Sequence, residues 1–103
     1  MPKYTRLGLV IGQSVKLPCN TSLTADIIWT YDTDGRYLHN VYSNGLIDSD
    51  KPRLAVKSTA DSFYSLVLFG AELNDSGLYN CYDRKGVRKI GYELDIAGMR
   101  YYF

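Results

Sequence analysis

The residues best suited to chemistry are one histidine and two cysteines, and their setting does not indicate a catalytic centre. His39 is the only histidine, and a serine-histidine-aspartate centre built on it would need a nucleophile motif that the sequence lacks. Cys19 and Cys81 are the only cysteines. Taken alone, two cysteines are compatible with buried free thiols as well as with a disulfide.

Two short segments have a superficial likeness to ligand-binding loops. Residues 32–35 read Asp-Thr-Asp-Gly, as at the start of a calcium loop, but Tyr37 and Ser43 stand where such a loop needs glycine and glutamate. Gly8 and Gly12 have neither the spacing nor the lysine of a phosphate-binding loop. We therefore expect no enzymatic activity, no metal site and no cofactor, and we interpret residues 32–35 as a hairpin turn.

Length and charge narrow the class of protein further. The chain has 103 residues, of which 12 are Lys or Arg and 11 are Asp or Glu, so its net charge is +1. That length suits a single domain, and the charge balance disfavours nucleic acid as a partner. No apolar run approaches the roughly 20 residues that a membrane-spanning helix requires.

The elements that would position these residues are strands. Short runs of Val, Ile, Thr and Tyr alternate with polar residues and are separated by Gly, Asn, Asp and Ser, which is typical of an all-β domain. We expect these runs to pack as two antiparallel sheets. The predicted strands are residues 7–11, 15–19, 27–31, 36–41, 42–46, 54–57, 63–69, 77–83 and 90–96.

Three motifs along this pattern resemble the immunoglobulin superfamily. They are Gly-Gln-Ser-Val-Lys-Leu-Pro-Cys at residues 12–19, Trp29, and Asp-x-Gly-x-Tyr-x-Cys at residues 75–81. The resemblance implies an immunoglobulin-like two-sheet β-sandwich over residues 1–97, with residues 98–103 as a tail or the start of a linker. It also implies a disulfide between Cys19 and Cys81, with Trp29 packed against it.

The same resemblance assigns roles to the residues before the second cysteine. Tyr79 would be a corner residue whose hydroxyl bonds backbone upstream of Asp75, and Gly77 would allow a close approach there. Arg53 would pair with Asp75, although a solvated charge at a strand end is an alternative. These features, and the room for extra strands between Trp29 and Cys81, favour a variable-type domain over an intermediate-type one.

One departure from the family pattern concerns the last strand. Antigen-receptor variable domains carry Phe-Gly-x-Gly there, and this chain keeps only the second glycine, Gly91. We therefore expect a germline-encoded receptor or adhesion domain rather than a rearranged antigen receptor.

The implied disulfide predicts an oxidising, extracellular location. Two sequons, at Asn20 and Asn74, are candidate glycosylation sites and agree with that location. We expect the chain to be an ectodomain of a secreted or cell-surface protein, attached to a membrane only through a segment outside this sequence.

A binding surface follows from period-two alternation. If Trp29 and Cys81 point inward, Ile28, Thr30, Asn80 and Tyr82 point outward, together with Leu78. On the following strand we favour Tyr37, His39 and Val41 as the outward set over Leu38 and Asn40. These side chains would form an exposed face that binds a protein ligand or a second copy of the chain.

A basic hairpin borders that face. Arg84, Lys85, Arg88 and Lys89 follow Asp83, whereas acidic residues gather at Asp32, Asp34, Asp48 and Asp50. The expected function is non-catalytic protein recognition in an immune or cell-adhesion receptor. The alternatives are a structural spacer, or a domain that binds an anionic glycan or lipid through residues 84–89.

Overall fold

The computed structural model describes residues 3–19, 27–33, 37–43, 46–47, 53–58, 64–83 and 85–98. Within those strands, the side chains of residues 33, 37–40, 46–47, 57–58 and 64 are not described. Asn20, Arg84, Asp34, the acidic residues 48 and 50, and the segment 99–103 lie outside the described residues, so the expectations for them stay predictions.

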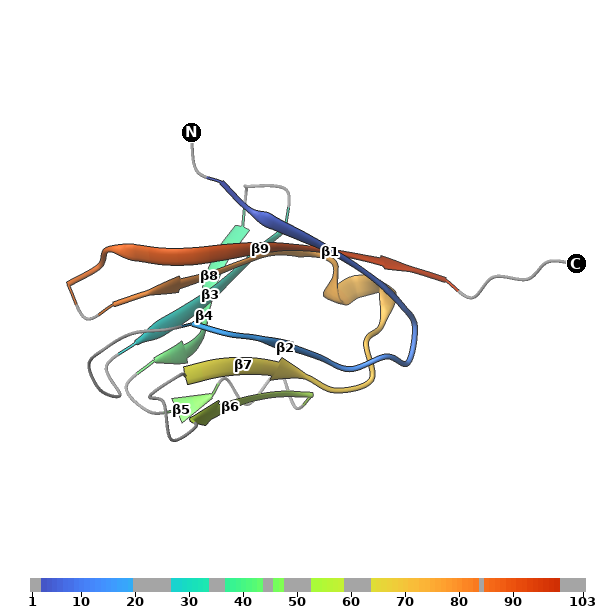
Figure 1. The fold of residues 1–103 in the computed structure, drawn as a ribbon, viewed down its shortest axis with the longest axis horizontal. Coiled ribbons are helices and arrows are strands. Elements are labelled where there is room, and N and C mark those ends of the chain that lie inside the picture. Colours follow the sequence, from blue (N-terminus) through green and yellow to red (C-terminus); the bar gives the residue numbers. More distant parts are fainter. Residues whose placement is uncertain are drawn as a thin grey trace, which may run out of the picture.

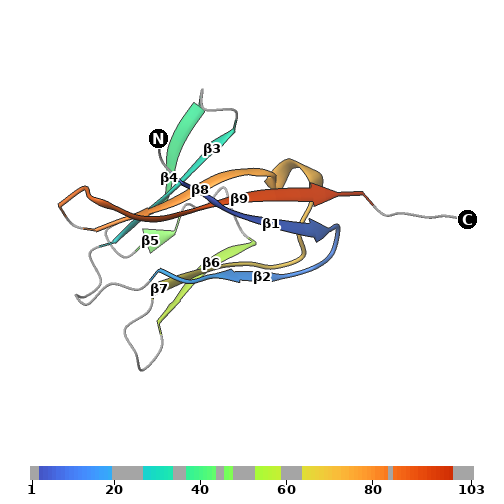
Figure 2. The same ribbon diagram turned by 45° about the horizontal axis from the view of Figure 1, so that its top comes forward.

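In these described ranges, nine strands form two facing sheets, with one short 3-10 helix, η1 (Leu73–Asp75), between β7 and β8 (Figures 1 and 2). The larger sheet contains, in spatial order, β1 (Thr5–Val10), β9 (Arg88–Ala97), β8 (Gly77–Tyr82), β3 (Ile28–Thr33), β4 (Tyr37–Ser43) and β5 (Leu46–Ile47). The smaller sheet contains β2 (Val15–Leu17), β7 (Tyr64–Leu68) and β6 (Leu54–Ser58). No helix among the described residues is long and apolar enough to cross a bilayer.

This architecture confirms the predicted two-sheet sandwich of variable type. β4 and β5 are the extra strands between β3 and β6, and both belong to the larger sheet. Their division differs from the expectation, because β4 continues to Ser43 and β5 is only Leu46–Ile47.

The first strand also departs from a purely antiparallel arrangement. β1 pairs with β9 in parallel, with Leu7 opposite Leu94. The chain then turns and enters the other sheet as β2, and Gly12 allows this turn because its φ is 95°. Backbone bonds hold the turn to β9 and to the segment after β7: Ile11 N donates to the Ala97 carbonyl at 3.0 Å, and Gly12 N to the Ala71 carbonyl at 2.9 Å.

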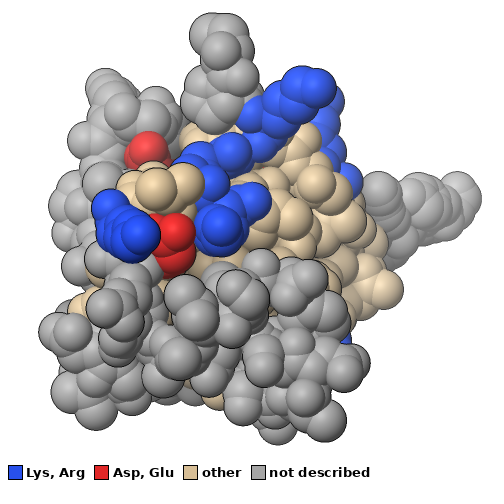
Figure 3. Space-filling view, turned by 60° about the vertical axis from the view of Figure 1, so that its left-hand side comes forward, with Lys and Arg blue, Asp and Glu red and all other residues tan. Residues whose placement is uncertain are grey.

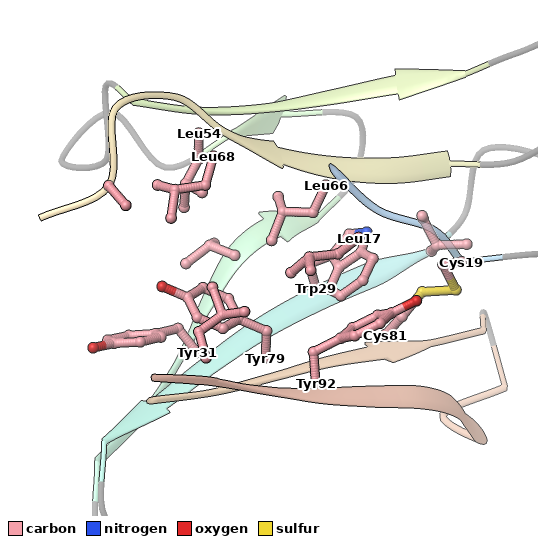
Figure 4. Packing of buried hydrophobic residues seen from close by; sticks show 14 of the residues in the cluster. Leu17, Cys19, Trp29, Tyr31, Leu54, Leu66, Leu68, Tyr79, Cys81 and Tyr92 are labelled. Atoms are coloured by element: carbon pink, nitrogen blue, oxygen red, sulfur yellow. A yellow bond between two sulfur atoms is a disulfide. The ribbon is translucent and has the colours of Figure 1, made fainter. Parts of the chain in front are cut away.

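The core lies between the sheets and is built from their inward rows (Figure 4). Leu17, Leu66 and Leu68 of the smaller sheet are at most 1% exposed, and they face the aromatic residues of the larger sheet. Burying a side chain of this size contributes about 1.5–3 kcal/mol, so this layer is the main source of cohesion.

The predicted disulfide is confirmed. Cys19 and Cys81 are bonded across the core, with their Cα atoms 6.4 Å apart. Trp29 is fully buried and lies directly opposite Cys81 in the β3–β8 register. The Tyr92 ring stacks on Trp29 at 6.2 Å, and the Tyr92 hydroxyl donates to the Pro18 carbonyl at 2.6 Å. The bridge, the indole and this tyrosine thus tie β2 to three strands of the opposite sheet.

Two tyrosines anchor the corner after η1. The Tyr79 hydroxyl donates to the carbonyl of Asp75 itself at 2.6 Å, and not to backbone upstream of Asp75 as we expected. The Tyr31 hydroxyl lies 2.7 Å from the Ser76 carbonyl and 3.0 Å from that of Asn74, and its ring is 4.8 Å from the Tyr79 ring. Burial raises the pKa of Tyr79, which keeps its hydroxyl protonated and donating.

Arg53 and Asp75 form a two-point ion pair beside this corner. Arg53 Nη1 bonds Asp75 Oδ2, and Nη2 bonds Oδ1 at 3.1 Å. The hydrogen bond to the carboxylate raises the pKa of Arg53. Asp75 also accepts from Glu72 N at 2.7 Å and is only 6% exposed, so Arg53 is a partner of a buried carboxylate and not a solvated charge.

Gly77 should be the least replaceable glycine of the corner. Its φ is 149°, and an added Cβ would lie 2.8 Å from Tyr31 Cε1 and 2.9 Å from the Asp32 carbonyl oxygen. We expect Gly77→Ala to lower the free energy of unfolding by about 1–3 kcal/mol, measured by urea titration of the oxidised protein. Gly8→Ala is the matched control, because no described atom lies within 4 Å of its Cβ position. Equal stability of the two variants would contradict the close packing of Gly77 at the corner.

Candidate protein-binding face

The surface of interest is the outer face, defined as the side of β1, β9, β8 and β3 that points away from the smaller sheet. Its rows follow from the register: Ile28 is opposite Tyr82, Thr30 is opposite Asn80, and Asp32 is opposite Leu78. On β9, Gly91 lies beside Asn80 and Glu93 beside Leu78, and Arg6 of β1 is opposite Glu93. Alternation of the side chains therefore predicts the correct side of the sheet for the residues of β3 and β8.

We expected the outward residues of β3 and β8 to be exposed, and this expectation was wrong for Thr30 and Asn80. Ile28 and Tyr82 are partly exposed, but Thr30 and Asn80 are each only 4% exposed. Both lie in the middle row, and Asn80 is covered by side chains from β9 and from the start of the chain. The Thr30 hydroxyl is buried with no hydrogen-bond partner among the described residues.

The favoured assignment on β4 was wrong for Val41. Val41, a member of the preferred outward set, is fully buried in the core. The register places His39 opposite Tyr31 and Tyr37 opposite Thr33, but the side chains of Tyr37 and His39 are not described, so the expectation for them stays a prediction. Asn40, from the set that we disfavoured, is opposite Thr30 in this register. A register shift between Trp29 and Thr30 accompanies this arrangement.

Arg88 lies flat on the outer face and does not extend into solvent. Its Nε donates to Asn80 Oδ1 at 2.6 Å, and its guanidinium carbon lies 4.6 Å from the centre of the Tyr4 ring. Its Nη2 donates to the carbonyl of Lys3, and Asn80 Nδ2 donates to the Tyr4 hydroxyl at 3.2 Å. We call Tyr4, Asn80 and Arg88 the Arg88 cluster. It fixes the start of β1 to β8 and β9.

Gly91 makes room for this cluster. A Cβ at Gly91 would lie 2.0 Å from Arg88 Nη2, 2.6 Å from Asn80 Oδ1 and 2.8 Å from Tyr4 Cε1. Tyr4 and Gly91 were not among the predicted site residues. The sequence signal for this site is Gly91, the glycine that is retained from the last-strand motif. The sequence does not show which side chain lies over that glycine.

The tip of the β8–β9 hairpin is held by Asp83. Its Oδ1 accepts from Lys85 N at 2.8 Å and from Val87 N at 2.9 Å, and Gly86 N donates to the Asp83 carbonyl at 2.9 Å. The backbone bond from Val87 is the main reason that the pKa of Asp83 is lowered, and the bond from Lys85 and the nearby lysines add to it. The carboxylate stays charged and keeps the tip ordered.

Basic side chains gather at this end of the molecule. Lys85 is exposed, and Lys89 Nζ lies 4.0 Å from Asp83 Oδ2 with its side chain 40% exposed. Figure 3, which views the hairpin end, shows the Lys and Arg atoms concentrated around a smaller acidic area.

Asn74, the other predicted glycosylation site, is exposed in η1. No cluster of three or more His, Cys, Asp and Glu side chains that could hold a metal occurs in the described part of the chain.

The order of the six-stranded sheet, the buried tryptophan on its disulfide and the tyrosine corner agree with a family comparison. The immunoglobulin V-set domain family matches residues 4–96. The chain belongs to this family. A comparison with curated proteins finds no match.

Solved structures similar to this V-set domain include a heterodimer, an adhesion domain and a receptor. A chain of the ZIG-8–RIG-5 IG1–IG1 heterodimer is 25% identical to this chain, with a TM-score of 0.74. The match covers 93% of this chain and 84% of the other. The extracellular domain of the voltage-gated sodium channel beta4 subunit, a parallel homodimer with a role in cell-cell adhesion, is 20% identical with a TM-score of 0.72, covering 97% and 96%. A marsupial T cell receptor is 19% identical with a TM-score of 0.78, covering 97% of this chain and 51% of the other.

The Arg88 cluster should depend on Gly91. We expect Gly91→Ala to displace the Arg88 and Tyr4 side chains and to lower the free energy of unfolding by about 1 kcal/mol, because a Cβ there removes a charge-assisted bond and a stacked contact. Urea titration measures the loss. Gly91→Ala introduced into an Arg88→Ala background is the control, since the added methyl then has its main obstacle removed. An equally large loss of unfolding free energy in the Arg88→Ala background would contradict the role assigned to Arg88.

Proposed function

We propose that this V-set domain is a non-catalytic protein-recognition module of an extracellular receptor or adhesion protein, and that it binds through the outer face. The observation that carries the proposal is the pair formed by Ile28 and Tyr82. These two apolar side chains are direct cross-strand neighbours and are partly exposed on the outer face.

The pair has the chemistry of an interface anchor. Tyrosine combines a large apolar surface with a hydroxyl and has few rotatable bonds, so ordering it on binding costs little. The strands below it are held by the disulfide and by Trp29, so the backbone does not have to rearrange when a partner docks.

The surroundings also suit a protein partner. Val87, at the hairpin tip, is 54% exposed, and the exposed Lys85 lies two residues before it. An apolar centre with charged groups at its edge is the usual anatomy of a protein interface. Thr30 and Asn80, which are buried in the row next to the anchors, would support the face rather than contact the partner.

The covalent chemistry of the domain supports an extracellular setting. A disulfide persists in oxidising compartments, and an exposed sequon asparagine at position 74 is accessible for glycosylation. Similarity to a domain that forms a heterodimer, at 25% identity, supports a protein partner.

Binding of an anionic glycan or lipid has less support. Arg88 is committed to Asn80, Tyr4 and the Lys3 carbonyl, and Lys89 lies beside the Asp83 carboxylate. Of the described hairpin residues, this leaves Lys85 as the cation farthest from these contacts, which is a weak basis for holding a polyanion.

Substitution of Tyr82 tests the proposal. We expect Tyr82→Asp to weaken association at least tenfold, because it places a charge in the apolar centre of the interface. Association is measured by sedimentation velocity of the oxidised domain over a concentration series, and by binding of the tetramerised domain to an array of extracellular proteins. Phe69→Asp is the matched control, because Phe69 is 43% exposed and follows β7 of the other sheet.

Three outcomes would contradict recognition through this face. Binding that survives Tyr82→Asp but is lost on Lys85→Glu and in high salt would favour an anionic glycan or lipid. Equal losses for Tyr82→Asp and Phe69→Asp would place the effect in folding. No association in either assay would favour a spacer.

A further inference from the structure

One edge of the larger sheet is open along a whole strand. β1 is the last strand of that sheet, and among the described strands only β9 pairs with it. An edge strand presents N–H and C=O groups that a further strand can bind. This edge is six residues long, whereas β5 at the opposite edge of the sheet has only two.

Hydrogen bonds show which backbone groups of β1 face the open edge. Ile11 N donates to the Ala97 carbonyl of β9. Because successive residues of a strand direct their backbone groups to opposite sides, the odd-numbered residues of β1 bond to β9. The even-numbered residues, which point to the open edge, are Arg6, Gly8 and Val10.

The groups of Val10 are already bonded, and those of the other two residues are available. Val10 N donates to Gln13 Oε1 at 2.9 Å, and Gln13 N donates to the Val10 carbonyl at 3.1 Å. No described strand bonds the outward N–H and C=O groups of Arg6 and Gly8. The open part of the edge is therefore the segment from Arg6 to Gly8.

Gly8 leaves a gap on the outer side of this segment. It is exposed, and no described atom lies within 4 Å of the position that its Cβ would take. A glycine inside a strand often marks a place where another backbone approaches closely. Asp95 of β9, which is opposite Gly8, is also exposed. The Arg6 side chain is 73% exposed, although its Nε lies 3.5 Å from Glu93 Oε1.

We propose that a second copy of this chain adds its β1 to this edge in the antiparallel direction, with a two-fold axis between the two Leu7 residues and perpendicular to the sheet. In this register Arg6 of each copy lies opposite Gly8 of the other, and each such pair exchanges both N–H···O=C bonds. All the available groups of the edge are then satisfied. A register centred on Gly8 would instead oppose Arg6 to Val10, whose groups are bonded to Gln13.

The side chains on both sides of β1 suit this register. On the core side, Leu7 of one copy meets Leu7 of the other. Leu7 is only partly buried in the single chain, so this contact removes apolar surface from water. On the outer side, the gap at Gly8 lets Arg6 of the other copy reach toward Asp95. Their Cα atoms would be two strand spacings, about 10 Å, apart, and the two side chains together span that distance.

Edge pairing goes beyond the proposed function because it leaves the outer face open. Tyr82 is on β8 and Ile28 on β3, two and three strands from β1 in the sheet order. A two-fold axis perpendicular to the sheet keeps both outer faces on the same side. The pair of copies would present the Ile28–Tyr82 anchors twice, so a multivalent partner would bind with higher avidity.

Amide hydrogen exchange of the 15N-labelled, oxidised domain tests the pairing without a substitution. In the single chain the N–H groups of Arg6 and Gly8 face the open edge, whereas those of Leu7 and Leu9 are bonded to β9. We expect exchange at Arg6 and Gly8 to slow at least fivefold between about 50 μM and about 1 mM protein. Leu7 and Leu9 should be protected at both concentrations. Exchange at Arg6 and Gly8 that does not depend on concentration would overturn the proposal.

Gly8→Pro tests the backbone contact. Proline removes the outward N–H, and it is tolerated in an edge strand where that group faces solvent. We expect self-association to weaken at least tenfold, measured by sedimentation equilibrium with urea titration as the check of folding. Gly8→Ala keeps the N–H and is the matched control, with an affinity close to that of the wild type. Undiminished association of a folded Gly8→Pro variant would overturn the pairing.

A charge exchange tests the register and does not depend on the proline variant. Arg6→Glu and Asp95→Lys should each weaken self-association about fivefold, because each makes both contacts between these positions repulsive. An equimolar mixture of the two variants should restore wild-type affinity, since both contacts of the mixed pair again join opposite charges. A mixture that stays as weak as its components would overturn the register.

Failure of this inference is distinguishable from failure of the proposed function. Sedimentation of Gly8→Pro measures association through the outer face alone, and sedimentation of Tyr82→Asp measures association through the edge alone. Tyr82-dependent binding to another extracellular protein, in a domain that does not pair through β1, would overturn edge pairing and retain recognition by the outer face. Edge pairing in a domain that binds nothing through Tyr82 would do the reverse.

Discussion

The covalent bond between Cys19 and Cys81 is the constraint on which the rest of this domain depends. It joins β2 to β8 through the centre of the core, and Trp29 lies opposite Cys81 on the neighbouring strand. In the chain-entropy account, closing a loop of this length stabilises the fold by about 4 kcal/mol. The geometric effect is as important. Because successive side chains of a strand alternate between its two sides, an inward Cys81 requires an outward Asn80 and an outward Tyr82. The surface that we propose to bind a partner is therefore set by the bond in the core.

A second set of contacts holds the end of the sandwich opposite the β8–β9 hairpin. The Tyr79 and Tyr31 hydroxyls occupy the carbonyls around η1, and Arg53 neutralises the buried Asp75. These groups are polar and largely removed from water, so each depends on its partner. They fix where β8 begins, and through β8 they fix the register that aligns the rows of the outer face. The Arg88 cluster does the same for β1 on the outside of the sheet, where Gly91 leaves space for a guanidinium.

Much of this architecture could be predicted from the sequence, because its signals are local. Alternation of apolar and polar residues located the strands to within a few residues, and the family motifs predicted the disulfide, the indole beside it and the tyrosine corner. The parallel pairing of β1 could not be predicted, because an apolar run of five residues carries no information on direction or on which sheet it joins. The correct side of β4 was also undetermined, since Tyr37 and His39 are as plausible on an outer face as Leu38 and Asn40. The register shift between Trp29 and Thr30 is a tertiary feature with no sequence signal of its own.

The burial of polar side chains is the feature of the structure that the sequence pattern predicted least well. Thr30 and Asn80 are on the predicted side of the sheet, yet alternation says nothing of what lies above them. Arg88 illustrates the reason. Its long side chain runs along the sheet and covers Asn80, which is opposite Gly91 and not opposite Arg88 itself, and its direction depends on Tyr4 and Gly91.

The most direct test of the account is an amide chemical-shift map of the 15N-labelled, oxidised domain, recorded as its concentration is raised and as a partner found in the array of extracellular proteins is added. Recognition through the outer face predicts shifts in β3, β8 and β9, centred on Ile28, Asn80 and Tyr82, with β2, β6 and β7 unchanged. Shifts that cluster on the three-stranded sheet would contradict it.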